Sequence, residues 1–310
     1  MNKPLKKSTV ICFILICAFC FIIMKRFVNL SDDVFLRMLN NNDDALQIRE
    51  MYPIAEKPEG TSANQGFAIH KDIIFQLYSD NKLILINLVQ ERDNVITELN
   101  IHSLHGDTID FSNDYIKDEE FPLAYITADT NPANIFCVQI SRKGTSLIKT
   151  YSFKDIQKTG YYAGHCIDTD NRIIYLVGYN KNNYYDPDDN FMIVSSWDMD
   201  HFHKNDDGTI TPEFLEAFNI PFIVCVQGQR YFKGMLYLLS SHTGVQDIAI
   251  NTSIFIINPQ KGEIENVYDK FPEKIRTTEC EGIEFIKMNG ELKMVISTYG
   301  DPGKYFCLSR

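Results

Sequence analysis

The chain lacks the excess of positive charge that proteins binding nucleic acid usually carry. Its 41 Asp and Glu outnumber 30 Lys and Arg, which gives a formal net charge of −11. The first 26 residues hold five positive charges and no acid, so without them the net charge falls from −11 to −16. An acidic domain of this kind is a poor binder of nucleic acid and of anionic surfaces. We therefore expect no nucleic-acid partner.

Closely spaced cysteines are also absent after the amino-terminal segment. Three of the eight cysteines lie near the amino terminus, and the others are Cys137, Cys166, Cys225, Cys280 and Cys307. An odd number without close spacing is unlike a disulfide framework or a zinc site. Each of the five lies in a strand-like pattern, which predicts small buried side chains. A pairing of Cys166 with Cys280 stays open.

A long apolar run stands at the amino terminus, without the small residues that mark a clean cleavage site. It extends from Val10 to Met24, follows three lysines and ends at Lys25-Arg26. It is short for a spanning helix, which needs about 20 residues, but its flanks can extend it. We expect residues 1–28 to be a hydrophobic helix that acts as a signal anchor and contacts a membrane through residues 8–28. A cleaved or lipidated signal peptide and a buried helix are the alternatives.

A recurring pair of residues organises the rest of the chain. A glycine next to a polar residue opens each of five strand-like stretches: Gln65-Gly66, His105-Gly106, Gly164-His165, Gln227-Gly228 and Glu281-Gly282. Successive glycines are 40 to 64 residues apart, which is the scale of a four-stranded propeller blade and not of a helical repeat. We therefore expect an all-β fold, a five-bladed β-propeller over residues 61–310.

The last repeat runs out of chain before its fourth strand. Because an open sheet edge leaves backbone unpaired, we expect a strand from residues 45–54 to close the ring. Pro53 argues against the far end of that strand. Residues 29–60 would then form a stalk and the closing strand. In the third repeat, residues 210–220 are atypical and predict a short helical turn at Glu213 to Glu216.

The strand that opens each blade lines the central channel of a propeller. Polar side chains beside the repeated glycines, and further along the same strands, should therefore converge on the axis. They are Gln65, His105, Asp107, Asp110, His165, Asp168, Gln227, Glu281 and Glu284. Because buried polar groups need hydrogen-bond partners, such a channel is either a water-filled structural feature or a binding site.

Three chemistries fit these side chains. Two histidines with Glu281 could ligate a transition metal. A carboxylate pair, Glu281 with Asp107 or Asp168, could cleave a glycosidic bond, and a histidine could abstract a proton in a polysaccharide lyase. The catalytic candidates of an enzyme are His105, His165 and Glu281. The ligand-binding candidates are Gln65, Asp107, Asp168 and Gln227. The sequence leaves any metal or cofactor unknown.

The third repeat carries an insertion rich in aromatic and acidic residues. It holds the only tryptophan of the chain, Trp197, together with Tyr184 and Tyr185. Aromatic faces stack on sugar rings, so these three residues are expected to form a rim that contacts a glycan. The acidic stretch 186–190 lacks the Gly and Glu of an EF-hand calcium loop, and both it and residues 198–208 predict turns between strands.

These motifs resemble two groups of five-bladed propellers. The recurrent pairs, with Phe121 to Ile126 and Lys233 to Ser240, resemble the propeller of a staphylococcal phage receptor-binding protein and of teichoic-acid-cluster proteins over about residues 60–310. That resemblance implies a partner among cell-surface glycopolymers. Glu281 to Ile286 is similar to the closing motif of the calcium-activated nucleotidases, in which Glu and Ser hold a central calcium. Only Glu281 matches that ligand set, and amides and imidazoles are poorer ligands for a hard cation.

The sequence thus favours a membrane-anchored, extracytoplasmic propeller, periplasmic or at the cell surface. We expect it to bind a cell-envelope or environmental glycan at its central channel and, in an enzymatic version, to cleave that glycan as a lyase or hydrolase. A calcium-dependent nucleotidase-like hydrolase and a non-catalytic interaction propeller are the alternatives.

Overall fold

The fold is known from a computed structural model that describes residues 32–43, 46–53, 64–78, 82–87, 95–99, 101, 106–128, 134–181, 191–245, 248–299 and 303–310. Helix occurs there only at residues 32–40 and in α2 (Ile156–Thr159) and α3 (Glu273–Arg276). The prediction of an all-β fold is confirmed. In the described part of the chain no helix has the length and apolar character needed to cross a membrane. The apolar run at residues 10–24 lies outside that part.

The strands form four-stranded antiparallel groups, which we number as units one to five. Unit one contains β2 (Asn64–His70), β3 (Ile73–Tyr78), β4 (Lys82–Asn87) and β5 (Val95–Glu98). Unit two contains β6 (Gly106–Phe111), β7 (Ala124–Ala128), β8 (Asn134–Ser141) and β9 (Gly144–Ser152). Unit three contains β10 (Tyr161–Asp168), β11 (Ile173–Tyr179), β12 (Phe191–Lys204) and β13 (Ile210–Pro221).

The last two units complete the set. Unit four contains β14 (Val226–Phe232), β15 (Met235–Val245), β16 (Ile248–Asn258) and β17 (Glu263–Tyr268). Unit five contains β18 (Cys280–Met288), β19 (Glu291–Thr298), β20 (Lys304–Ser309) and β1 (Gln47–Pro53). Units two and three share one eight-stranded sheet because Ile210 of β13 forms a parallel bridge with Tyr151 of β9.

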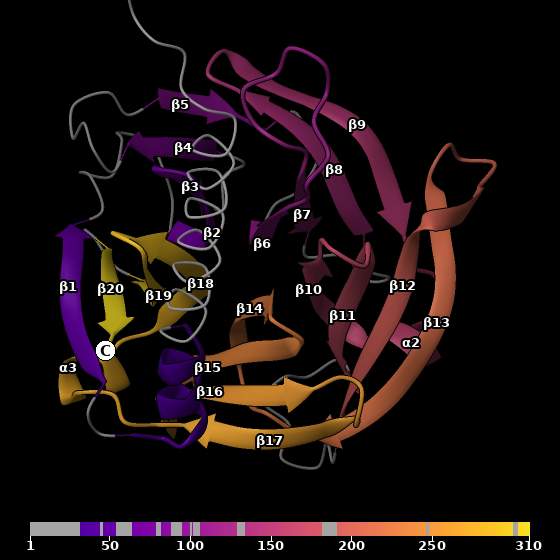
Figure 1. Cartoon of the computed structure of the whole chain (residues 1–310). Coiled ribbons are helices and arrows are strands. Elements are labelled where there is room, and N and C mark those ends of the chain that lie inside the picture. The colour runs from indigo at the N-terminus through magenta and orange to yellow at the C-terminus, as the bar shows by residue number, and fades with distance from the viewer. Residues whose placement is uncertain are drawn as a thin grey trace, which may run out of the picture.

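The first strands of the units surround a common axis (Figure 1). The strand β2 contacts β6, β6 contacts β10, β10 contacts β14, β14 contacts β18, and β18 contacts β2. The hydrophobic core is divided in the same way, because each of its clusters joins two neighbouring units, including units five and one. Sheets that pack face to face around an axis make a propeller-like β fold.

The recurrent glycine pairs mark a β-bulge at the start of each first strand. The register shifts between Asn64 and Phe67 in β2, and corresponding shifts occur next to Gly106, Gly164, Gly228 and Gly282. A bulge inserts extra residues that face a single partner residue and re-aims their side chains. The spacing read from the sequence therefore follows a repeated backbone feature.

Glycine is required at two of these bulges because a neighbouring backbone or aromatic ring approaches closely. A Cβ atom on Gly228 would lie 2.9 Å from the Cα of Gly282, and one on Gly282 would lie 2.7 Å from a ring carbon of Phe67. Real Cβ atoms essentially never come so close to other heavy atoms. The first strands of units four and five thus meet where both lack a side chain, and the Phe67 ring of unit one packs where a side chain of residue 282 would lie.

The amino-terminal residues complete unit five. The expected closing strand is confirmed, since β1 pairs antiparallel with β20 from Gln47 opposite Ser309 to Pro53 opposite Lys304. Pro53 is tolerated because it stands at the end of an outer strand. The helical segment 32–40 buries Phe35 and Leu39 in the core cluster that joins units four and five. The chain before β1 therefore also contributes to the core.

Two expectations for unit three were wrong. Residues 213–216, expected as a helical turn, lie within β13, and residues 198–203, expected as part of a turn, lie within β12. The turn itself is confined to residues 205–209, where the N–H of Asn205 donates to Thr209 O at 2.8 Å. The hairpin extends further than its polar sequence suggests because cross-strand pairing outweighs local turn propensity. The five cysteines outside the amino-terminal run are buried thiols, as expected.

Candidate functional site

A charged cluster lies where the first strands meet at the axis. Arg230 on β14 donates through Nη1 to Asp110 on β6, and its Nη2 lies 2.7 Å from Glu284 Oε2 on β18. These side chains are 15%, 3% and 2% exposed, so the ring encloses the cluster almost completely. A buried charge needs partners, and here one guanidinium serves two carboxylates.

Backbone groups extend the cluster to the two remaining first strands. The N–H of Ile167 on β10 donates to Asp110 Oδ2 at 2.9 Å, and that of Ile69 on β2 donates to Glu284 Oε2 at 3.3 Å. One polar network therefore joins the first strands of all five units. We assign it a structural role, since neither carboxylate has an open face for a substrate.

Burial strongly changes the protonation of the two carboxylates. It raises the pKa of Glu284 to about 7, against the opposing effect of Arg230, and it also raises the pKa of Asp110. The two carboxylates share one guanidinium, so neither is fully compensated for its burial. Because the pKa of Glu284 is about 7, this carboxylate can exchange a proton near neutral pH. Such a pKa suits acid–base chemistry, but a catalytic group must also reach its substrate.

His165, a catalytic candidate, is completely buried on β10. Its Nδ1 contacts Thr127 Oγ1, and among the described residues its Nε2 has no hydrogen-bond partner. Burial lowers the pKa of His165 to about 3, so the ring is neutral at physiological pH. A neutral imidazole could accept a proton, but this one faces no solvent. The structure therefore does not present His165 as an accessible base.

Three other candidates stand at the bulges that open the first strands. Gln65 and Glu281 are 6% and 4% exposed, whereas Gln227 is half-buried and donates through Nε2 to Glu279 Oε1 at 3.0 Å. In the register of β18, Glu281 is the extra residue between Cys280 and Gly282, and Gln227 is the corresponding residue of β14. Equivalent positions in the units thus present amide and carboxylate groups at the same end of the ring.

The remaining candidates lie elsewhere or outside the described residues. Asp168 accepts the N–H groups of Asp170 and Asn171, both at 3.1 Å, and therefore shapes the turn after β10 instead of facing a ligand. Asp107 occupies the bulge of β6, but its side chain lies outside the described part. So do the three residues His105, Tyr184 and Tyr185.

Trp197 is not on a rim, contrary to the expectation from the sequence. It is 3% exposed, its Nε1 donates to Ser195 Oγ at 2.9 Å, and its ring packs at 5.1 Å from Phe153 and 5.2 Å from Phe214. The side chain falls on the inner side of β12 because strand residues alternate between faces. The indole belongs to the core between units two and three.

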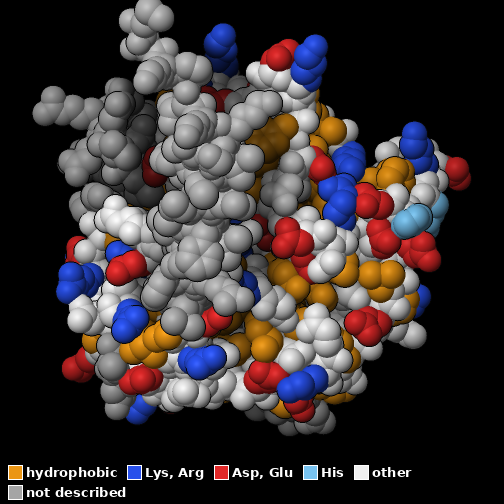
Figure 2. All heavy atoms as spheres, viewed as in Figure 1, with side chains coloured by type: hydrophobic (Ala, Val, Ile, Leu, Met, Phe, Trp, Pro, Cys, Tyr) orange, Lys and Arg blue, Asp and Glu red, His pale blue; other side chains and the backbone are white. Residues whose placement is uncertain are grey.

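A pocket of about 790 Å³ lies above this part of the core, at the periphery of unit three. Its floor includes Trp197, and its walls come from the β12–β13 hairpin and from the segment that leads into α2. The lining residues are Lys154, Asp155, Lys158, Trp197, Asp200, His201, Phe202, His203, Asn205, Thr211, Pro212, Glu213 and Phe214. Figure 2 shows histidine, acidic and basic side chains gathered on this protruding edge of the molecule.

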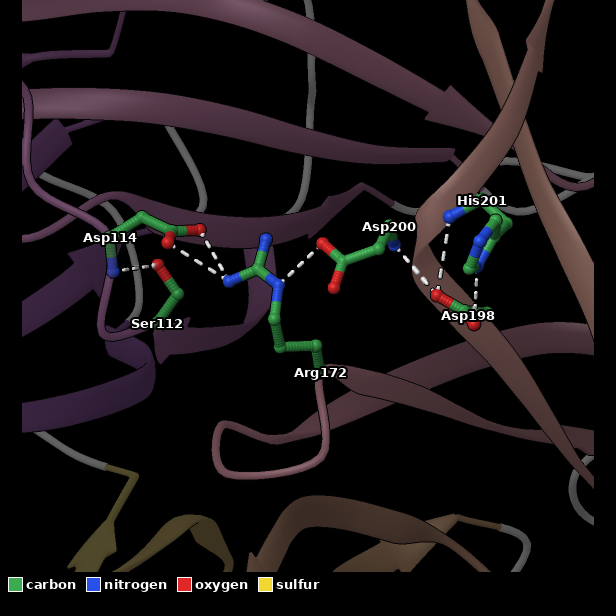
Figure 3. Close-up of polar contacts among 6 residues, drawn as sticks. All are labelled: Ser112, Asp114, Arg172, Asp198, Asp200 and His201. Atoms are coloured by element: carbon green, nitrogen blue, oxygen red, sulfur yellow. Dashed lines mark hydrogen bonds and ion pairs between the residues drawn. The ribbon is translucent and has the colours of Figure 1, made fainter.

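A chain of ion pairs holds one wall of the pocket (Figure 3). Arg172 binds both oxygens of Asp114 at 2.9 Å through Nη1 and binds Asp200 at 2.6 Å through Nε. Asp198 accepts from the N–H of Asp200 at 2.7 Å and lies 2.9 Å from His201 Nδ1. These contacts fix an irregular part of β12, where the register shifts between Asp198 and Phe202.

No metal site was found in the part of the chain that the structure describes. There, no group of three or more His, Cys, Asp and Glu side chains is arranged to hold a metal ion. The carboxylates of the axial cluster already bind Arg230.

Comparison with known proteins shows similarity to solved structures but to no family. No family model matches the chain, and no curated protein matches it. The crystal structure of Myxococcus xanthus glutaminyl cyclase is similar at 15% sequence identity and a TM-score of 0.47, over 83% of this chain and 96% of that one. The strand pairing of this chain and the contacts among its first strands make the fold propeller-like.

Two arginines with structural roles were missed in the sequence. Arg230 lies two residues beyond the repeated Gly228, and Arg172 lies in the turn between β10 and β11. A signal was available for Arg230, because it shares a strand face with Gly228 in a strand that should line the axis. Nothing local distinguishes Arg172, since its partners come from distant parts of units two and three.

Proposed function

We propose that this chain is a five-bladed β-propeller that binds a glycan at the mouth of its central channel. Five units of four strands and a core cluster between every pair of neighbours support the blade number. In this proposal residues 1–28 are a membrane anchor and residues 61–310 form the propeller. The propeller lies outside the cytoplasm and faces a cell-envelope glycan.

The observation that carries the proposal is the set of polar side chains at the bulges. Gln65, Gln227 and Glu281 stand at equivalent positions around one end of the axis. Carboxylates accept hydrogen bonds from hydroxyl groups, and amides both donate and accept them. A ring of such groups suits a ligand rich in hydroxyls, because a few well-placed polar groups fix the orientation of a ligand.

The burial of His165 supports a binding role over an enzymatic one. A general base must come within hydrogen-bond distance of the proton that it removes, and this ring is 0% exposed. Glu281 is 4% exposed, so by the same criterion it is assigned to hydrogen bonding and not to proton transfer.

The experiment is a titration of the full chain with cell-envelope oligosaccharides, followed by isothermal calorimetry. Gln227→Ala and Glu281→Gln should each weaken binding about tenfold, the effect of losing one or two hydrogen bonds to the ligand. Gln260→Ala removes an exposed amide from the turn after β16 and should leave the affinity unchanged. Binding that survives both bulge variants would contradict the proposal. Glycan turnover that is lost in His165→Ala would favour the enzyme instead.

A further inference from the structure

The pocket of unit three has the features of a binding site and lies apart from the axial site. It shares no residue with the bulges or with the cluster around Arg230, and at about 790 Å³ it is large enough for an oligosaccharide unit.

One wall of the pocket is held rigidly in an irregular conformation. Between Asp198 and Phe202 the strand β12 carries residues without a partner on β13, and His201 is one of them. Arg172, which holds Asp200 in this wall, itself has a positive φ of 56°. Bulges often occur next to binding sites because they redirect a side chain. The fixed side chain here is His201, whose Nδ1 contacts Asp198 and whose ring lines the pocket.

The pocket also exposes aromatic surface. Phe202 is 46% exposed, although a ring of its size is normally buried. Phe214 lies deeper, packed edge to face on Trp197, with Lys158 Nζ 4.3 Å from its ring centroid. Exposed aromatic faces favour the stacking of flat apolar surface, such as the C–H face of a sugar ring.

The ion pairs of the lining differ in length and exposure. Asp200 is bound by Arg172 at 2.6 Å, and Asp155 caps α2 and lies 3.4 Å from Lys158. Lys154 is 56% exposed and makes one long contact, 3.4 Å to Asp207, while His201 is 70% exposed. Arg172 thus neutralises Asp200 in place, whereas Lys154 and Lys158 make only long, exposed contacts that a ligand can replace. His201 uses Nδ1 for Asp198, which leaves Nε2 for a ligand.

We propose that this pocket is a second saccharide site, separate from the axis, that takes a sugar bearing an anionic group. The sugar ring stacks on Phe202, the anionic group binds Lys154 and the imidazolium of His201, and Glu213 accepts a hydroxyl. A carboxylate and a phosphate share this chemistry, so both are tested.

The pH dependence of ligand binding provides an independent test of the role of His201. Asp198 raises the pKa of His201, with smaller contributions from Glu213 on β13 and Asp200 on β12. Burial opposes this shift, and Lys154, Lys158 and His203 are the other basic groups that line the same pocket. An anionic ligand should bind more tightly as the pH falls through the titration of His201, and a neutral ligand should not respond.

The test is a calorimetric titration of the full chain with trigalacturonate, with neutral galactotriose and with a galactose phosphate. At least one anionic probe should bind about tenfold more tightly than galactotriose, as expected for one favourable charge contact. Phe202→Ala should weaken all binding at this site about tenfold. His201→Gln should weaken only anionic probes and abolish their pH dependence. Leu215→Ala removes an exposed apolar side chain of β13 outside the pocket and should change nothing.

Three outcomes would overturn this inference. Equal affinity for charged and neutral probes would contradict the charge preference, and unchanged binding in Phe202→Ala would contradict the location. Failure of all three probes to bind would reject the site. The two sites are separable, because Gln227→Ala alters the axis and not this pocket.

Discussion

At the scale of single residues, Glu284 is in the most unusual electrostatic environment. Its carboxylate is enclosed at the axis, where burial disfavours the charged form and the guanidinium of Arg230 is shared with Asp110. Its pKa is raised to about 7 from an ordinary value of 4.5. The folded protein therefore retains a proton on Glu284 at pH values where the unfolded chain has released it.

Glu284 should make the protein less stable as the pH rises. Below pH 4.5 both states hold the proton, so Glu284 has no effect; between pH 4.5 and about 7 the free energy of unfolding falls, and it levels off above that. Between pH 4.5 and about 8 the stability of Glu284→Gln should rise relative to that of the natural chain by about 3 kcal/mol.

Urea unfolding at several pH values measures this difference. Glu120→Gln is the matched control, because Glu120 is exposed and pairs with Arg142 at the surface. Parallel pH profiles for Glu284→Gln and the natural chain would show that the axial carboxylate does not titrate in this range.

At the scale of elements, the bulges and the amino-terminal segment decide how the units fit together. Each first strand begins with a bulge at the recurrent glycine pair, which lets Gly228 approach Gly282 closely. The helical segment 32–40 then fills the core between units four and five through Phe35 and Leu39. Asp32, at its start, is almost fully buried and lies 2.7 Å from Lys287. The segment is thus a structural part of the propeller-like domain.

Leu39→Ala should therefore destabilise the whole domain, although residue 39 precedes every strand. The side chain is 0% exposed, and truncation of a buried leucine leaves a cavity that costs about 2–5 kcal/mol. Arg37→Ala on the exposed side of the same segment should change stability by less than about 0.5 kcal/mol. Thermal unfolding of the two variants gives the comparison, and equal melting temperatures would mean that the segment does not pack on the core.

At the scale of the whole molecule, the network around Arg230 connects units that main-chain pairing leaves almost unconnected. Main-chain pairing operates within the units, and between described units it is limited to the single parallel bridge of Ile210 with Tyr151. The axial network adds polar contacts among the first strands of all five units. Together with the core clusters, it should make the ring unfold as one body.

Arg230→Met should weaken the entire ring. Removal of the guanidinium leaves two buried carboxylates unpaired, and breaking a buried ion pair costs about 3–5 kcal/mol. Arg142→Met breaks an exposed pair with Glu120 and should cost about 1 kcal/mol or less. Urea unfolding followed by both circular dichroism and Trp197 fluorescence measures stability and cooperativity together. A loss of stability no larger than in Arg142→Met would contradict the role given to the network.

The sequence by itself determined the local features that repeat along the chain. Alternating apolar residues predicted strands, the glycine pairs marked the positions where those strands bulge, and the missing last strand predicted the pairing of β1 with β20. These are properties of short segments and of their spacing.

Only the tertiary structure decided which side chains meet. Arg230 was not singled out because its partners, Asp110 and Glu284, are 120 and 54 residues away. Trp197 was placed on a rim because it belongs to an insertion rich in aromatic and acidic residues, whereas its strand turns it into the core. Residues 198–203 were expected as part of a turn, whereas they extend β12, and residues 200–203 of them line a pocket. Contacts between distant segments depend on register, burial and shared partners, none of which a local pattern contains.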